Sequence, residues 1–247
     1  MKETTAIIER IKRVNAGYQR LELSVDDSLL KLKPGQSIMA RRSDRWDPYL
    51  LEQWWPVNLL RGKLVIERPD SEQYEPGQVV PLLGVIGQPF RFRGSASLRN
   101  VLLVAYNTPP TPLLMTIPWL LGNKISVTMA LLGSAAAYDT QHLPPEVEIE
   151  LGGDEFEWEN QVMTLGWADQ VFITVGPDDE FQRFNQVIER FRELRHDIPR
   201  NYLFGVFQGL LPCGSGACHS CMVRTTQGTA LVCTEGPAFD LTQVILS

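Results

Sequence analysis

The sequence predicts an α+β protein of several domains: an N-terminal antiparallel β-barrel, an α/β domain with a parallel sheet, and a small C-terminal segment. Three observations support this. Short apolar runs separated by turn residues fill the first part of the chain. Longer apolar runs that alternate with helical patterns follow, as in a parallel sheet. All four cysteines lie in the last 35 residues. We place the domains at residues 1–97, 98–200 and 201–247.

The first domain contains short β-rich or alternating runs. Two Pro-Gly-Gln triplets, at 34–36 and 76–78, each precede an apolar run, and Pro-Gly is typical of a type II turn. Several short strands with turns between them favour a small barrel. We expect the polar tract Arg41–Pro48 to be a loop. The expected strands are Thr4–Val14, Gln19–Leu23, Ser37–Ala40, Lys63–Glu67 and Val79–Leu83.

The second domain reads as strands that alternate with helices. Thr111 and Pro112 suit the N-cap and first position of a buried helix that extends to about Leu121. Asp178–Arg195 has apolar residues at helical spacing and arginines toward its end, which predicts an amphipathic helix. The expected strands are Val101–Ala105, Ile125–Leu132, Val147–Leu151 and Val171–Val175, and the run Leu203–Phe207 leads into the cysteine loop.

Composition excludes some functions. A net charge of −6 argues against nucleic-acid binding. The most apolar window, Pro112–Leu121, is about half the length of a membrane span and contains a proline. The charged, alternating start MKETTAIIERIKRV does not read as a signal peptide. With cysteines in a ligand-like pattern, these features predict a cytoplasmic protein.

The cysteines follow the pattern C-x4-C-x2-C-x11-C, and its first three positions match the spacing of plant-type [2Fe–2S] ferredoxins. Glycine reaches positive φ without strain, so Gly214 and Gly216 would let backbone N–H groups turn toward cluster sulfurs. A [2Fe–2S] cluster is therefore the favoured cofactor. Its predicted ligands are Cys213, Cys218, Cys221 and Cys233.

Other uses of the cysteines stay open. Two disulfides would need an oxidising compartment. A structural zinc ion is a stronger alternative, although zinc knuckles usually use two C-x2-C pairs. A thioredoxin-like pair of Cys218 and Cys221 would leave Cys213 and Cys233 unexplained. His219, within the loop, either tunes the cluster through a hydrogen bond or is a solvent-exposed loop histidine.

The domain order and the run Cys213–Pro237, followed by Ala-Phe-Asp240, resemble the electron-transfer subunit of bacterial dihydroorotate dehydrogenase, in the ferredoxin-reductase superfamily. Gly84–Gly87 is similar to the glycine turn at the end of that family's barrel, and Gly176-Pro177 to an element of its nucleotide domain. The resemblance implies a ferredoxin-reductase-like fold. It also implies an electron path from a partner flavin dehydrogenase through the cluster to FAD and then NAD.

Two motifs depart from that family. Its barrel carries Arg-Pro-x-Ser, whose arginine reaches the flavin pyrophosphate, and the corresponding stretch here is Trp55–Asn58. The tryptophan brings no charge to a phosphate, which argues against FAD. Trp54 and Trp55 either stack on a flavin, line a partner interface, or pack on the neighbouring domain. The remaining FAD candidates are Pro56, Val57 and Asn58. The arginines that could substitute in space are Arg42, Arg45 and Arg61.

The nucleotide domain departs further. Where the family has a glycine-rich turn, the strand Val101–Ala105 continues into Tyr106–Pro112, which has no glycine and three prolines. Proline removes N–H donors and restricts φ, so this turn does not suit a phosphate cradle. Val175 replaces the family's cysteine before Gly-Pro. We predict that NAD(P)H binding has been lost.

Two hypotheses follow. In the first, the chain is an electron-transfer subunit, an oxidoreductase component rather than a complete enzyme, whose [2Fe–2S] cluster relays electrons to or from a partner flavin dehydrogenase. In the second, it is a non-catalytic regulatory or scaffold module of the same fold with a structural cluster or zinc. The complete cysteine set favours the first, and the altered nucleotide motifs favour the second.

Overall fold

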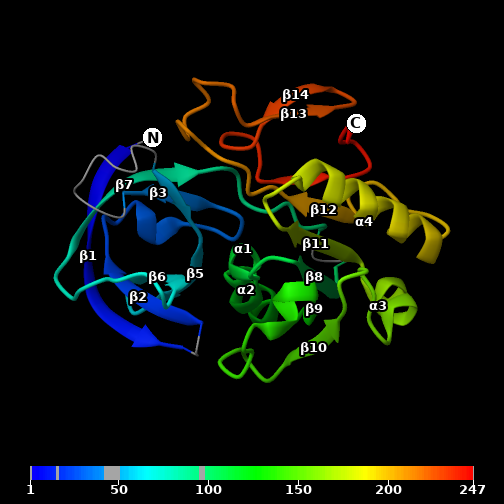
Figure 1. The fold of residues 1–247 in the computed structure, drawn as a ribbon, viewed down its shortest axis with the longest axis horizontal. Coiled ribbons are helices and arrows are strands. Elements are labelled where there is room, and N and C mark those ends of the chain that lie inside the picture. Colours follow the sequence, from blue (N-terminus) through cyan, green and yellow to red (C-terminus); the bar gives the residue numbers. More distant parts are fainter. Residues whose placement is uncertain (1, 15–16, 42–50, 95–97, 247) are drawn as a thin grey trace.

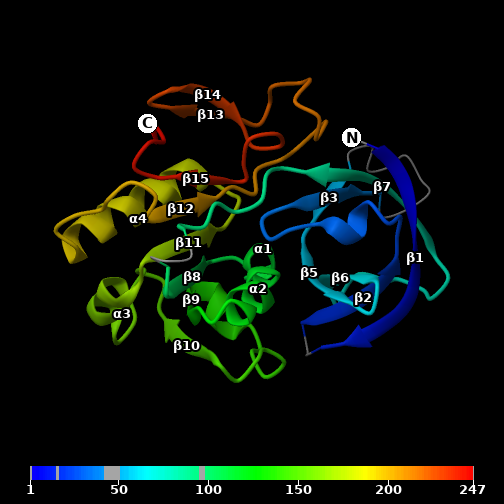
Figure 2. The ribbon, with the colours of Figure 1, turned by 180° about the vertical axis from the view of Figure 1, so that it is seen from behind.

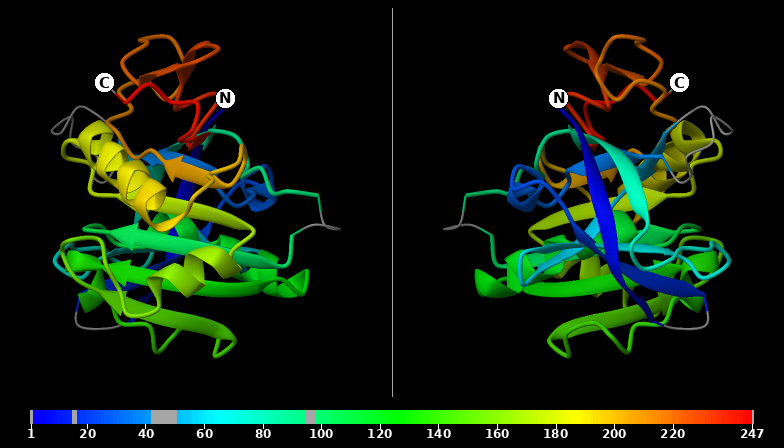
Figure 3. Two further views of the ribbon diagram at one scale, coloured as in Figure 1. Left: turned by 90° about the vertical axis from the view of Figure 1, so that its right-hand side faces the viewer. Right: turned by 90° about the vertical axis from the view of Figure 1, so that its left-hand side faces the viewer.

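The computed structural model describes residues 2–14, 17–41, 51–94 and 98–246. A barrel and an α/β domain lie side by side, and the C-terminal segment lies over both (Figure 1). Figures 2 and 3 show the same arrangement, with the last hairpin projecting from one end. The predicted fold class is therefore confirmed. Among the described residues, none forms a helix long and apolar enough to span a membrane.

The barrel is an antiparallel sheet of seven strands in the order β4-β3-β7-β1-β2-β6-β5. Its core is built from side chains on alternate positions of these strands, as the period of two requires. The predicted strands are present, and β4 and β5 are additional to them. The elements are β1 (Lys2–Arg13), β2 (Tyr18–Ser24), the 3-10 turn η1 (Leu29–Lys31), β3 (Ser37–Ala40), β4 (Glu52–Trp54), β5 (Pro56–Leu60), β6 (Lys63–Pro69) and β7 (Val79–Ile86).

The α/β domain is a six-stranded sheet in the order β10-β9-β8-β11-β12-β15, in which only β15 runs antiparallel to its neighbour. Its strands are β8 (Asn100–Tyr106), β9 (Ser126–Leu132), β10 (Val147–Gly152), β11 (Gln170–Val175), β12 (Leu203–Val206) and β15 (Ala238–Asp240). Its helical elements are α1 (Thr111–Leu114), α2 (Thr116–Gly122), the 3-10 turn η2 (Gly133–Ala137), α3 (Gln161–Trp167) and α4 (Glu180–Leu194).

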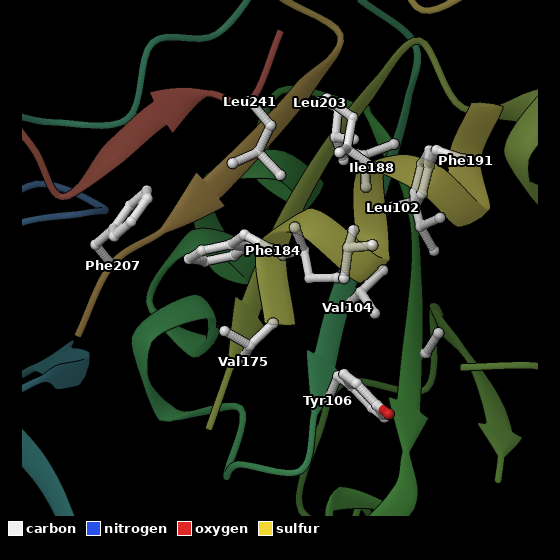
Figure 4. Packing of buried hydrophobic residues seen from close by; sticks show 14 of the residues in the cluster. Leu102, Val104, Tyr106, Val175, Phe184, Ile188, Phe191, Leu203, Phe207 and Leu241 are labelled. Atoms are coloured by element: carbon white, nitrogen blue, oxygen red, sulfur yellow. The ribbon is translucent and has the colours of Figure 1, made fainter. Parts of the chain in front are cut away.

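Two hydrophobic cores cover the two faces of this sheet. On one face α4 packs Phe184, Ile188 and Phe191 against β8 and β12 (Figure 4). On the other face α1 lies against β11 and α2 against β9, and the same core includes Trp55 and Val57 of the barrel segment 55–60. The barrel is thus joined to the sheet through α1, and both domains share one apolar boundary.

The structure corrects details of the helix prediction. The expected N-cap Thr111 is the first residue of α1, Pro110 holds the cap position, and no side chain caps this end. The buried apolar run is divided at Met115 into α1 and α2. Of the predicted loop Arg41–Pro48, all but Arg41 lies outside the described residues.

The C-terminal segment adds the hairpin β13 (Met222–Thr225) and β14 (Gly228–Leu231). It also adds β12 and β15 to the α/β sheet. Two strands therefore anchor this segment in the sheet. The division of the chain at residues 97 and 200 stays a prediction.

Candidate iron–sulfur site

The hairpin explains the spacing of the last two cysteines. Cys221 directly precedes β13 and Cys233 follows β14 by two residues, so the antiparallel pairing brings them together. The N–H of Val232 donates to the carbonyl of Cys221 (3.0 Å), and the two sulfurs lie 3.3 Å apart. The gap of eleven residues is therefore the length of one short hairpin.

The first two cysteines lie on the loop before the hairpin. Cys213 is partly exposed, Cys218 is exposed, and Cys221 and Cys233 are buried. All four are free thiols rather than disulfides. The side chain of Cys218 donates to the sulfur of Cys213. The loop thus pairs one partly exposed and one exposed thiol, and the hairpin pairs two buried ones.

Backbone N–H groups of the loop are directed at sulfur. The N–H of Ser215 donates to the Cys213 sulfur (3.4 Å), and that of Gly216 donates to the Cys233 sulfur. Gly214 and Gly216 have φ of 61° and 81°, the left-handed conformation that lets the loop turn these groups inward. This bears out the geometric role expected of the two glycines.

The pKa values of two of the thiols are shifted in opposite directions. Hydrogen bonds from the Ser215 side chain and then from the N–H of Cys218 lower the pKa of Cys213 to about 6. Burial, and then the neighbouring Cys221, raise the pKa of Cys233 to about 12. N–H donors favour a thiolate, which is the form that binds iron or zinc.

The loop rests directly on the barrel. A Cβ on Gly214 would lie 3.0 Å from Cδ1 of Ile86 and 3.2 Å from Cγ of Met39. The N–H of Gly87 donates to the carbonyl of Cys233 (2.9 Å), and the Gln88 side chain donates to the carbonyl of Thr234 (2.8 Å). The predicted glycine turn at the end of the barrel therefore contacts the cysteine loop.

The donor set fits an iron–sulfur cluster. Four thiols on one loop and one hairpin, with N–H groups aimed at two of the sulfurs, supply the ligand number and hydrogen bonds that such clusters require. Within the described ranges, no three His, Cys, Asp or Glu side chains are grouped so as to hold one metal ion. His219 adopts a φ of 58° within the loop.

A pocket of about 550 Å³ lies between the barrel and the α/β domain. Its wall is largely apolar and aromatic, with Tyr18, Met39, Trp55 and Leu211 among its residues. This lining would suit a flavin ring. Of the FAD candidates, Trp55 borders this pocket, whereas Asn58 lines a different one.

The charges in this pocket suit a pyrophosphate less well. Arg68 is the cation among its lining residues, and its guanidinium donates to Glu52 (2.7 Å) and to Glu72 (2.8 Å). Glu67, also in the wall, is a buried carboxylate paired with Arg20 (3.1 Å). The cation is already neutralised by carboxylates, so the described lining does not fit the two negative charges of FAD.

The remaining barrel candidates are placed as follows. Pro56 and Val57 are buried, and the Asn58 side chain accepts a hydrogen bond from the N–H of Leu59 (2.8 Å). Arg61 is exposed in the β5–β6 turn. Arg42 and Arg45 lie outside the described residues. Trp54 is fully buried, edge-on to Tyr74 and beneath Arg68.

The turn after β8 is filled by its own side chains. Asn107 has a φ of 53°, and its side-chain oxygen accepts a hydrogen bond from the N–H of Ser134 (2.9 Å). The following helix α1 has only four residues and contains Pro112. The N–H groups that would hold a dinucleotide pyrophosphate are thus largely replaced by prolines, and the residues present do not fit this group.

Comparison with known proteins agrees with the cysteine geometry. Residues 209–245 match the iron–sulfur cluster binding domain of dihydroorotate dehydrogenase B. The chain is 29% identical over 180 residues to a probable electron transfer subunit of dihydroorotate dehydrogenase B (NAD(+)) from Methanopyrus kandleri. That match covers 67% of this chain and 62% of the relative. The resemblance inferred from the sequence is therefore confirmed.

Solved structures share the fold at low sequence identity. The NADH-dependent reduced ferredoxin–NADP oxidoreductase, studied for flavin-based electron bifurcation, has a TM-score of 0.73 at 14% identity over 98% of this chain and 90% of that chain. A ferredoxin reductase of carbazole 1,9a-dioxygenase, in its FAD apo form, has a TM-score of 0.59 at 11% identity, over 85% and 68%. Both likenesses establish the ferredoxin-reductase-like architecture.

Proposed function

Because residues 209–245 match an iron–sulfur cluster binding domain, we propose that this chain is an electron-transfer subunit. It would hold a [2Fe–2S] cluster and relay single electrons to or from a partner dehydrogenase that contains flavin. The observation that carries the proposal is that the cysteine loop lies against the hairpin, with the N–H of Gly216 directed at the sulfur of Cys233 and the sulfurs of Cys221 and Cys233 3.3 Å apart. The proposed ligands are Cys213, Cys218, Cys221 and Cys233.

The residues of the site have separable tasks. When bound, the cluster supplies one-electron redox chemistry. Gly214 and Gly216 orient the N–H groups that stabilise negative charge on sulfur, which also tunes the reduction potential. Burial of Cys221 and Cys233 keeps one side of the site out of water. Exposure of Cys218 places the other side at the molecular surface, where a partner could approach.

FAD and NAD enter the proposal differently. The aromatic pocket beside Trp55 supports a flavin ring, and the paired Arg68 speaks against the FAD pyrophosphate. The turn filled by Asn107 supports loss of the NAD site. Electrons would then end at the cluster or at flavin, with another acceptor.

A second candidate function is a regulatory or scaffold module in which the cysteines hold zinc or a structural cluster. The turn after β8, which Asn107 fills and which leads into the short helix α1, favours this function, because a module without catalysis has no use for a dinucleotide. The thiol set alone would serve either function.

A cofactor inventory on anaerobically purified protein tests the proposal. Iron, acid-labile sulfide, zinc and acid-extracted flavin are measured per chain, and the reduced protein is examined by EPR. Iron and sulfide in equal amounts, with a reversible one-electron signal, are expected. Zinc without iron or sulfide would reject electron transfer and leave the module. Flavin in the extract would decide the FAD question separately.

A further inference from the structure

A buried carboxylate lies beneath the segment that leads into the cysteine loop. Glu180, the first residue of α4, is 6% exposed. Its Oε1 accepts a hydrogen bond from the N–H of Gln208 (2.6 Å), and the N–H of Gly209 also donates to this carboxylate. These two amides lie four and five residues before Cys213, the first predicted ligand.

The side chain of Gln208 ties the same segment to the sheet. Its amide donates to the hydroxyls of Thr174 and Thr108 and to the carbonyl of Val175 (3.3 Å). Thr174 is in β11 and Thr108 follows β8, so one side chain joins the ends of two neighbouring strands. The segment after β12 is therefore held by its backbone from α4 and by its side chain from the sheet.

An aromatic contact also holds this segment in place, and we call residues 207–209 with these contacts the anchor. Phe207 packs on Phe184 of α4 at 4.6 Å between ring centroids (Figure 4). It also packs on Phe239 of β15 at 5.7 Å. Its N–H donates to the carbonyl of Pro237 (3.0 Å). Pro237 in turn lies four residues after Cys233. The same anchor therefore holds the chain on both sides of the cysteine set.

Burying a carboxylate is costly, which makes this arrangement informative. Burial raises the pKa of Glu180 to about 7, and the N–H groups of Gln208 and Gly209 oppose that rise. An apolar residue at this position of α4 would avoid the cost but would leave two backbone N–H groups without an acceptor. The Glu180 carboxylate therefore acts as the hydrogen-bond acceptor for the backbone of Gln208 and Gly209 rather than stabilising α4.

We propose that Glu180 is a positioning residue for the cluster site. Together with the Gln208 amide, it fixes residues 207–209 at the end of the sheet and so sets the place of Cys213 relative to the hairpin cysteines. This inference rests on the proposed electron-transfer function. It concerns residues outside the ligand set, of which Gln208 and Gly209 also line the pocket beside Trp55.

The test uses the protein as purified, with its cofactor, and three variants. Glu180→Gln has nearly the same shape but brings an NH2 group toward two N–H donors. Gln208→Leu keeps the backbone bonds to Glu180 and removes the amide. Asp169→Asn is the matched control, since the Asp169 carboxylate also accepts hydrogen bonds from two backbone N–H groups, those of Arg99 (2.8 Å) and Asn100 (2.9 Å), at the opposite end of the sheet. Readouts are amide exchange of residues 208–211 and the EPR signature of the reduced cluster.

We expect Glu180→Gln to accelerate exchange of these amides roughly tenfold, the effect of losing one hydrogen bond. It should also alter the EPR line shape, as should Gln208→Leu to a smaller extent, while Asp169→Asn changes neither. Faster exchange with an unchanged EPR signature would overturn positioning, as would equal effects of the Asp169 control. Wild-type exchange in both anchor variants would overturn the anchor itself.

Failure of the proposed function would be recognised separately. If the protein contains zinc instead of iron and sulfide, the electron-transfer proposal fails. The anchor can then still be judged from amide exchange and from the rate at which a chelator removes the zinc. Faster release in Glu180→Gln than in Asp169→Asn would support positioning of the thiols, and equal rates would reject it.

Discussion

Replacing Gly214 by alanine tests whether the cysteine loop is seated on the barrel. The substitution has two costs. A φ of 61° places the new side chain in the left-handed region, at roughly 1–2 kcal/mol. The new Cβ would also lie 3.0 Å from Cδ1 of Ile86 and 3.2 Å from Cγ of Met39, and such overpacking costs about 1–3 kcal/mol.

Gly77 supplies the matched control. Its φ is 87°, but a Cβ there would meet nothing within 4 Å. Gly77→Ala therefore carries the backbone cost alone. The two variants are compared by thermal unfolding at equal cofactor content per chain. For a protein of this size each kcal/mol lowers Tm by about 2–4 °C. Gly214→Ala should therefore melt roughly 2–12 °C below Gly77→Ala.

A double-mutant cycle identifies the contact. Ile86→Val removes the atom nearest to the new Cβ and by itself costs about 0.5–1.5 kcal/mol. In the Gly214→Ala background this cost should shrink or reverse, because the deletion relieves the crowding. If Gly214→Ala melts no lower than Gly77→Ala, or if Ile86→Val is purely additive with it, the loop is not packed on the barrel as described.

Three further predictions address the ligands, the domain boundary and pH. Cys218→Ser should abolish the one-electron EPR signal and lower bound iron, and a full signal would exclude this cysteine as a ligand. Tyr138→Phe removes a 2.6 Å hydrogen bond from the α/β domain to the buried Glu67 of the barrel and should lower unfolding free energy by about 1–3 kcal/mol, whereas an unchanged Tm would contradict a coupled boundary. The folded-state pKa of Glu180 is raised from 4.5 to about 7, so its stabilising effect is full below pH 4.5 and is lost as pH rises through 7. Glu180→Gln should therefore gain stability relative to wild type across this window, by up to about 3 kcal/mol, and parallel stability curves would refute the assignment.

Local patterns in the sequence predict much of this fold. Continuous apolar runs such as Val101–Ala105 need strands buried on both faces, and the structure provides them. The helical spacing of Phe184 and Phe191 likewise predicts α4. Cysteine spacing alone indicates the proposed ligand set, because the number of residues between cysteines is a local property.

Contacts between distant residues are absent from such patterns. Glu67 and Tyr138 are 71 positions apart, and nothing local to either indicates that they share a hydrogen bond across the domain boundary. The stretch that begins at Pro56 forms strand β5 and packs on α1, a contact that its own residues do not indicate. Glu180 gave no signal either, since an acidic residue at the start of a helix is ordinary.

The hydrogen bonds that the polar groups already make indicate which cofactors the described residues can hold. A site that binds a charged ligand needs polar groups whose hydrogen bonds are completed by that ligand. Here Arg68 is paired with two carboxylates, Asn107 accepts from Ser134, and Gln208 joins two strand ends. Within the described residues these groups already satisfy one another, so a dinucleotide would have to break bonds that stabilise the fold. The hydrogen bonds from the loop N–H groups to the sulfurs of Cys213 and Cys233, by contrast, become stronger when each sulfur is a thiolate bound to metal. The described residues therefore fit iron and sulfide best, flavin next and NAD least.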